Sequence, residues 1–327
     1  MPRLGIVGTL VWDTIHGPDG GEPVMDWGGI AYSLAAWEAS APPGWTMVPI
    51  IKVGADLRES ADEFLSTLEG VACLDFVVTV PEPNNRVGLF YHDHSRRCER
   101  LTGGVPGWTA EEILRGGLSG DALYVNFISG WELDPAAAAA LRSEFHGPTW
   151  CDVHSLIFGV AEDGVREPRP LEGRADWLGS FDLVQVNEDE LEVLSVAGPL
   201  RSDRLADLLS DGAEAVFVTL GPAGAEWVAR AETRWAPTPA DGTTRAVVAG
   251  SAAVETIAPE GATDPTGCGD VWGLTCFGAL LGGAGIPEAV RRANRFAAET
   301  ATGRGTIGLA SKLATVMSGM SGADLRR

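Results

Sequence analysis

Short runs of β-type residues alternate with helical patterns along most of the chain, and this alternation constrains the fold more than any other feature. The runs cover residues 4–7, 48–53, 123–127, 149–153, 183–186 and 216–220. Such alternation is typical of a mainly parallel sheet with helices on both faces. A chain of 327 residues is long enough for one large core. We therefore expect a single α/β domain, built as a three-layer sandwich, over residues 1–327.

Two stretches do not fit the alternation. Residues 12–27 are rich in Gly, Pro and Asp, and residues 84–101 contain the alternating segment 86–91. Both resemble hairpins more than crossover helices. They are either ordinary surface hairpins or parts of a small separate sheet that covers a site.

Charge and composition exclude several classes of partner. The chain has 24 basic and 45 acidic residues, a net charge of −21, and its only lysines are Lys52 and Lys312. Such a surface repels nucleic acids and anionic membranes, so we expect neither as a partner. We find no signal-peptide pattern, no transmembrane run and no C-x-x-C pair among the five cysteines. These features predict a cytoplasmic protein with reduced thiols.

The segment from Asp264 to Asp270 reads D-P-T-G-C-G-D and precedes an apolar run at 271–281. A glycine turn lets backbone N–H groups converge on one point, and the helix that follows adds the positive end of its dipole. Anions bind at such a point without any lysine. A carboxylate at its mouth can accept a proton from a hydroxyl that attacks a bound phosphate. The segment therefore indicates phosphoryl transfer, unless the glycines and Asp270 only cap a buried helix.

Two other segments place polar groups where parallel strands end. Asn187 to Glu190 follows the run at 183–186 and opens a helix, which indicates either a helix cap or a ligand-binding edge. The run at 216–220 continues into a glycine turn at 221–224, where a chain can pass close to a ligand. Neither segment is decisive alone.

Together, these motifs resemble the ribokinase-like, or PfkB, family of carbohydrate and nucleoside kinases. The family signature near the C-terminus is D-T-x-G-A-G-D, from which this chain departs at Pro265 and Cys268. The N-x-x-E pattern at 187–190, the T-x-G-x-x-G pattern at 219–224 and the G-x-x-x-x-D pattern at 8–13 occur in the family's order. The resemblance implies a ribokinase-like fold in which residues 12–27 and 84–101 form a small β lid over the acceptor. An exposed lid sheet could also pair in a homodimer.

The resemblance also implies an activity and a set of site residues. The activity is ATP-dependent phosphorylation of an alcohol on a small sugar, polyol or nucleoside. Asp270 is then the catalytic base, and the amides of Gly267, Cys268 and Gly269 hold the phosphoryl group. The residues implied on the ATP side are Asn187, Glu190, Thr219, Gly221, Gly224 and Asn294. The residues implied on the acceptor side are Asp13, Gly28, Gly29, Ser33 and Asp152. Mg²⁺ is expected near Glu190, and a monovalent cation such as K⁺ near Asp264 and Thr266.

Departures from the family pattern concern the acceptor. Ser33 stands where many sugar kinases have Asn, and His154 stands where a D-x-N sequence is common. A common hexose or ribose is therefore not assumed. The P-loop pattern and the dinucleotide-binding glycine pattern are both missing from the sequence. The remaining alternative is a non-catalytic sensor of sugars or nucleotides on a kinase scaffold.

Overall fold

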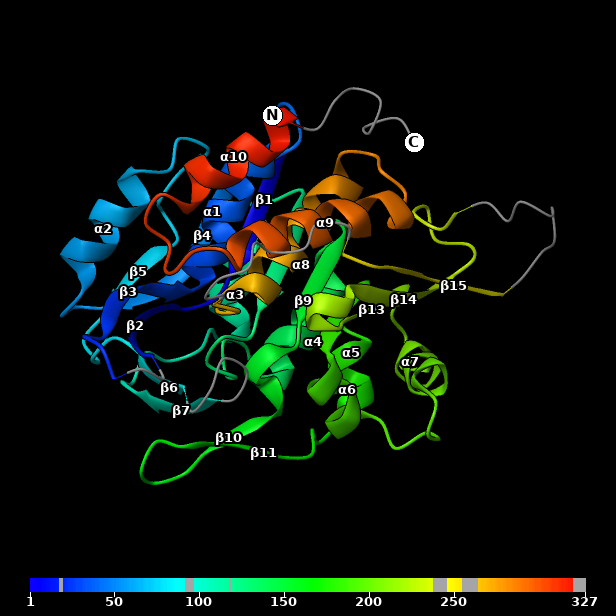
Figure 1. Cartoon of the computed structure of the whole chain (residues 1–327), viewed down its shortest axis with the longest axis horizontal. Helices are drawn as coiled ribbons and strands as arrows, with labels where there is room; N and C mark the ends of the chain where they lie inside the picture. Colours follow the sequence, from blue (N-terminus) through cyan, green and yellow to red (C-terminus); the bar gives the residue numbers. More distant parts are fainter. Residues whose placement is uncertain (18–19, 92–96, 118, 238–245, 255–263, 320–327) are drawn as a thin grey trace.

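The computed structural model describes residues 1–17, 20–91, 97–117, 119–237, 246–254 and 264–319 (Figure 1). Within these residues, a nine-stranded sheet has the order β15-β14-β13-β12-β9-β8-β1-β4-β5. From β5 to β13 every pairing is parallel, whereas β14 and β15 extend the sheet in antiparallel fashion. The strands are β1 (Arg3–Val7), β4 (Thr46–Gly54), β5 (Val77–Val80), β8 (Ala122–Asn126), β9 (Thr149–Asp152), β12 (Leu183–Asn187), β13 (Ala215–Thr219), β14 (Ala225–Arg230) and β15 (Val247–Ala252).

Helices cover both faces of this sheet, which confirms the predicted three-layer α/β fold. One hydrophobic cluster joins the sheet to α1 (Ile30–Ser40), α2 (Arg58–Ser66), α8 (Cys268–Leu281), α9 (Ile286–Thr300) and α10 (Leu309–Gly319). A second cluster joins the other face to α3 (Ala110–Gly117), α4 (Pro135–Glu144), α5 (Arg174–Leu178), α6 (Glu188–Leu194) and α7 (Arg201–Ser210). Since both faces are covered, the central strands are largely apolar, and the polar residues Asn126, Asp152 and Asn187 stand where β8, β9 and β12 end. None of the helices described is both long and apolar enough to span a membrane.

The predicted lid is a four-stranded sheet with the order β3-β2-β6-β7. Its strands are β2 (Leu10–His16), β3 (Val24–Gly29), β6 (Arg86–Tyr91) and β7 (Arg97–Thr102). The β2–β3 and β6–β7 pairs are antiparallel, and β2 pairs with β6 in parallel. A small apolar cluster that includes Val11, Leu89 and Ile128 joins this sheet to the chain after β8. Of the predicted lid segments, residues 18–19 and 92–96 lie outside the described residues.

A further hairpin was not predicted from the sequence. It consists of β10 (Phe158–Val160) and β11 (Arg166–Pro168) and follows the short 3-10 helix His154–Ile157. A bridge between Arg100 and Val165 joins this hairpin to the lid strand β7. The buried Arg166 side chain donates to the main-chain oxygen of Ile128 at 2.8 Å. The hairpin therefore forms one wall beside the lid.

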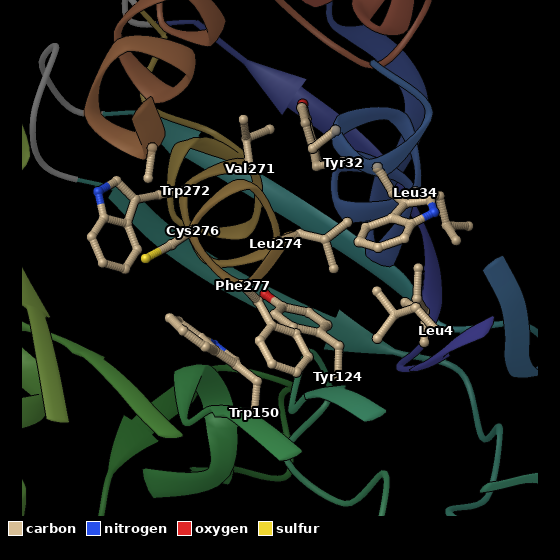
Figure 2. Packing of buried hydrophobic residues seen from close by; sticks show 14 of the residues in the cluster. Leu4, Tyr32, Leu34, Tyr124, Trp150, Val271, Trp272, Leu274, Cys276 and Phe277 are labelled. Carbon is tan, nitrogen blue, oxygen red and sulfur yellow. The ribbon is translucent and has the colours of Figure 1, made fainter. Parts of the chain in front are cut away.

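Helix α8 lies in the centre of the core and carries the segment that was predicted to bind an anion (Figure 2). Aromatic rings pack between this helix and the sheet, with ring centroids 5.0 Å apart for Trp150 and Phe217 and 5.6 Å apart for Trp150 and Phe277. Trp272 lies 5.9 Å from Phe217 in the same group. Large, well-packed rings hold a helix firmly. The first turn of α8 is therefore fixed against the carboxyl ends of the central strands.

Candidate active site

Asp270 lies on the first turn of α8 and is 5% exposed. Asn126, the last residue of β8, donates from Nδ2 to Asp270 Oδ1 at 2.7 Å. Gly267 caps the helix in a left-handed conformation with φ 76°. The glycine turn, the helix start and the carboxylate therefore meet at one place, as the segment predicted. Asn126 was not predicted, although a lone polar residue at the end of an apolar parallel strand is a usable signal.

Tyr32 of α1 lies directly against the glycine turn. A Cβ atom on Gly267 would lie 2.2–2.4 Å from atoms of the Tyr32 ring. Burial raises the pKa of the Tyr32 phenol well above its usual range, and nearby carboxylates add to the shift. Those carboxylates are on Asp13, Asp264, Asp270 and Asp26. Acids from the lid and acids from the α8 segment thus surround one phenol, which places the predicted acceptor side next to the predicted phosphoryl site.

On the acceptor side, glycines make room for an acid. Asp13 on β2 is 4% exposed, and a Cβ atom on Gly28 would lie 1.8 Å from its Oδ2 atom. Gly29 caps α1 with φ 58°, and a Cβ atom there would lie 2.7 Å from the main-chain oxygen of Thr9. Ser33 is fully buried, with its hydroxyl 3.5 Å from the main-chain oxygen of Asp270. The structure therefore places Ser33 against the main chain of Asp270.

Three buried acids lie close enough to influence one another. Burial raises the pKa of Asp152 well above its usual range, and the charges of Glu190 and Asp270 raise it further. The backbone N–H of His154 opposes this rise at both Asp152 and Glu190. His154 has φ 39°, and among the described residues it is the one non-glycine residue with positive φ. We attribute this uncommon conformation to the two carboxylates that its N–H serves.

Glu190 and Asn187 form a reciprocal cap at the start of α6. The Glu190 N–H donates to Asn187 Oδ1 at 2.8 Å, and the Asn187 N–H donates to Glu190 Oε2 at 2.9 Å. Burial raises the pKa of Glu190 to about 8, and the charges of Asp189 and Asp270 add to the rise. The segment thus caps α6, and the carboxyl group of Glu190 also lies near enough to Asp270 to interact with its charge.

Two cations were predicted at two separate places, Mg²⁺ near Glu190 and a monovalent cation near Asp264 and Thr266. Within the described part of the chain, no three His, Cys, Asp or Glu side chains form a group that could hold a metal ion. Nevertheless, the buried oxygen ligands around Glu190 suit Mg²⁺, because a divalent cation would relieve the repulsion among these acids. Mg²⁺ therefore fits this region only together with further oxygen ligands, such as phosphate or water.

Asp264 and Thr266 are bonded to each other. Asp264 Oδ1 accepts from the Thr266 N–H at 2.9 Å and from the Thr266 hydroxyl at 2.6 Å. Arg304 Nε lies 3.8 Å from Asp264 Oδ2. A positive charge of the protein therefore stands beside the Asp264 carboxylate, whereas the resemblance assigns the monovalent cation to carbonyl oxygens of Asp264 and Thr266.

The predicted nucleotide side contains a cavity of about 400 Å³. It lies beside the turn that follows β13, where Gly221 has φ 53° and Gly224 has φ 99°. Arg201 crosses its wall and forms ion pairs with Glu188 and, at 2.7 Å, with Glu226. The lining residues are Glu188, Arg201, Leu220, Ala223, Ala225, Glu226, Ser251, Ala252 and Ala253. Thr219 ends β13 next to this turn.

Asn294 lies behind the cavity wall. Its Oδ1 atom accepts from Trp272 Nε1 at 2.7 Å, and its Nδ2 atom donates to the main-chain oxygen of Ala252 at 2.8 Å. The side chain is 4% exposed. The structure thus gives Asn294 a supporting position, in which it ties α8 and α9 to the end of β15.

The peptide between Gly269 and Asp270 is held from the sheet. Gln185 of β12 donates from Nε2 to the main-chain oxygen of Gly269 at 3.0 Å. The Cys268 thiol lies 3.4 Å from the main-chain oxygen of Ala297. Because a peptide is planar, a fixed carbonyl also fixes the direction of the following N–H. Gln185 was not among the predicted residues, and its type alone does not indicate this contact.

Comparisons with known proteins agree with this geometry. Residues 159–313 match the sequence model of the pfkB family carbohydrate kinases. Among solved structures, the ribokinase of Thermotoga maritima is 19% identical, with 97% of this chain and 100% of that chain covered and a TM-score of 0.70. The Arabidopsis thaliana ribokinase complexed with ribose and ATP is 18% identical, with 97% and 98% covered and a TM-score of 0.70.

A pyrophosphate-dependent kinase of the ribokinase family, complexed with a pyrophosphate analog and myo-inositol, is 18% identical. In that comparison 92% of this chain and 96% of that chain are covered, and the TM-score is 0.70. A search of the curated proteins gave no match. The chain therefore has the ribokinase-like fold. The resemblance to the ribokinase-like, or PfkB, family of carbohydrate kinases is confirmed.

Proposed function

We propose that this protein is an ATP-dependent phosphotransferase that phosphorylates an alcohol group of a small sugar, polyol or nucleoside. The observation that supports it most is the buried Asp270 carboxylate, held by Asn126 at the glycine-capped start of α8. A non-catalytic sensor would have no use for an acid oriented beside an anion-binding helix start.

In this mechanism, Asp270 accepts the proton of the acceptor hydroxyl while the hydroxyl oxygen attacks the terminal phosphorus of the donor. The new P–O bond forms as the bond to the leaving nucleoside diphosphate breaks. The amides of Gly267 and Gly269, with the helix dipole, stabilise the negative charge on the phosphoryl group. The Cys268 N–H, which the sequence also predicted as a donor, instead donates to the main-chain oxygen of Pro265 at 3.2 Å. The hydrogen bond from Asn126 keeps the carboxylate in the orientation that proton transfer requires.

ATP as donor is supported by the cavity beside the turn at 221–224. Its partly apolar wall of Leu220, Ala223 and Ala252 suits a nucleobase, and the cavity of about 400 Å³ is within the usual range for small-ligand sites. When bound, Mg²⁺ would supply positive charge to the donor phosphates near Glu190 and Asn187. A monovalent cation, if bound, would be held by carbonyl oxygens of Asp264 and Thr266, and no step of the mechanism is assigned to it.

A polyhydroxylated acceptor is supported by two buried acids, Asp13 on the lid strand β2 and Asp152 at the end of β9. Asp13 and Asp152 are buried carboxylates, and each can accept hydrogen bonds from two hydroxyl groups. A carboxylate such as that of Asp13 disfavours an anionic acceptor through like-charge repulsion. We therefore propose a neutral sugar, polyol or nucleoside.

The test is a transfer assay with a panel of neutral sugars, polyols and nucleosides, with ATP and pyrophosphate as alternative donors. Pyrophosphate is included because a similar solved structure is described as pyrophosphate-dependent. We expect ATP-dependent transfer to at least one acceptor, and a loss of at least about 100-fold in turnover for Asp270→Asn. Binding without transfer for every donor and acceptor would favour the sensor, and full activity of Asp270→Asn would exclude the proposed base.

A further inference from the structure

Asp26 on the lid strand β3 is a buried acid that no part of the proposed chemistry uses. It pairs in register with Asp13 on β2, so the two carboxylates lie on the same face of an antiparallel pair, and they are 6% and 4% exposed. Like charges directly opposite each other destabilise a sheet. Such an arrangement requires compensating contacts.

The compensating contacts come from a turn near the end of the chain. Asp26 Oδ2 accepts from the Thr306 N–H at 2.6 Å, from the Ile307 N–H at 3.2 Å and from the Thr306 hydroxyl at 3.3 Å. Asp26 Oδ1 accepts from the Trp27 N–H at 2.7 Å. Hydrogen bonds from several donors stabilise a buried carboxylate strongly. The Asp26 carboxylate thus accepts its hydrogen bonds from groups of the protein, and these contacts do not require a ligand.

A glycine makes this close approach possible. Gly305 has φ 71°, and a Cβ atom there would lie 2.3 Å from Asp26 Oδ2. The preceding residue, Arg304, lies beside Asp264. Asp264 in turn fixes the N–H and hydroxyl of Thr266, the residue before the glycine turn of α8. A continuous set of contacts therefore runs from the lid strand, through Asp26 and the turn at 304–307, to the predicted phosphoryl site.

We propose that Asp26 is a positioning residue that couples the lid on the acceptor side to the donor side of the site. The inference rests on the proposed function, because it assigns the two sides to acceptor and donor. Asp26 contacts neither substrate. It transmits the position of the turn at 304–307, which contacts Asp264 beside the predicted phosphoryl site, to β3. From β3 the effect reaches Asp13 and Gly28, which lie next to Asp26 on the acceptor side. Occupying the donor site should therefore order the lid.

The experiment uses Mg·ADP and, separately, inorganic pyrophosphate as probes of the donor site in the full-length protein. Calorimetry measures their binding, and hydrogen exchange followed by mass spectrometry measures protection of β2 and β3. In wild type, we expect a bound probe to slow exchange in β3 by about fivefold or more, the lower end of typical coupling between sites. In Asp26→Asn, we expect the slowing to fall below about twofold, because an amide cannot accept all of these hydrogen bonds.

Glycine variants supply a matched pair that leaves the lid sequence unchanged. Gly305→Ala places a methyl group against Asp26, whereas Gly308→Ala has nearly the same φ, 72°, and no heavy atom within 4 Å of the added Cβ. Gly305→Ala should lose the protection of β3, and Gly308→Ala should keep it. Thr306→Val, which removes only the hydroxyl contacts, should lose part of it. Unfolding temperatures identify any variant that fails to fold.

The outcomes separate the two proposals. If wild type binds a probe but β3 shows no protection, or if Gly305→Ala and Thr306→Val are protected as wild type is, the coupling role of Asp26 is wrong and the proposed function stands. If wild type binds neither probe, the proposed donor site is wrong, and the coupling role falls with it.

Discussion

Asn126 Nδ2 lies 2.7 Å from Asp270 Oδ1, although 144 residues separate the two in the chain. Both side chains are buried, so the contact fixes the carboxylate without help from solvent. Asn126→Ala should reduce turnover by as much as about 100-fold, because a misplaced base reacts poorly. The measurement is kcat with the acceptor found by the transfer assay.

The isosteric variant Asn126→Asp distinguishes orientation from packing. It preserves the volume of the side chain but replaces the donor with a second carboxylate, so turnover should fall at least as far as in Asn126→Ala. Wild-type turnover in Asn126→Asp, with an unchanged unfolding temperature, would show that the contact plays no part in transfer.

Glu190 makes stability depend on pH. Its pKa is about 8 in the folded protein and 4.5 for the ordinary group, so between these values the folded state holds a proton that the unfolded state has lost. The free energy of unfolding should therefore decrease as the pH rises through this window. Urea unfolding of wild type at about pH 5 and about pH 8.5 checks the sign.

Glu190→Gln is the matched variant, because the amide keeps the size of the group but does not ionise. The decrease in stability between the two pH values should become smaller in this variant. A remainder is expected, because burial shifts Asp152 in the same direction. An equal decrease in both proteins would show that Glu190 is not the group that titrates.

The glycine turn before α8 should not tolerate a side chain. Gly267→Ala adds backbone strain of about 1–3 kcal/mol at φ 76° and also pushes a methyl group into the Tyr32 ring. Gly283→Ala is the control, since it has φ 91° and no heavy atom within 4 Å of the added Cβ. Unfolding free energies should fall in both variants, and transfer should be lost only in Gly267→Ala.

The acceptor side has a similar test at Gly28. A methyl group there would lie 1.8 Å from Asp13 Oδ2, so Gly28→Ala must displace the carboxylate. Loss of a hydrogen bond to a charged group should raise KM for the acceptor roughly 10- to 100-fold and leave KM for ATP nearly unchanged. Gly21→Ala, in the same lid segment with no heavy atom within 4 Å of the added Cβ, should behave as wild type. A rise in KM for ATP alone would contradict the placement of Asp13 on the acceptor side.

The parallel core and the lid could be predicted because their signals are local. The runs that became β1, β4, β8, β9, β12 and β13 are mostly apolar, as expected for strands covered on both faces, and few polar residues such as Lys52 and Gln185 interrupt them. The parallel edge strand β5 and the antiparallel strands β14 and β15 were missed. The burial of β15 alternates between exposed and half-buried positions, which leaves little apolar signal at the edge of a sheet.

In the candidate site, the motif residues could be predicted, but the residues that hold them in position could not. Asp270 and Gly267 stand in a recognisable pattern, whereas Asn126, Gln185 and Asp26 act through partners 84–280 residues away. Such contacts become visible only when the strand order is known.

Every residue of α8 from Asp270 to Leu280 is buried, so the proposed base stands on a helix enclosed by the hydrophobic interior. The carboxylate therefore cannot move toward or away from its substrates unless that interior opens. Heat inactivation should accordingly coincide with cooperative melting of the whole protein, with no earlier step in which only the catalytic centre is lost.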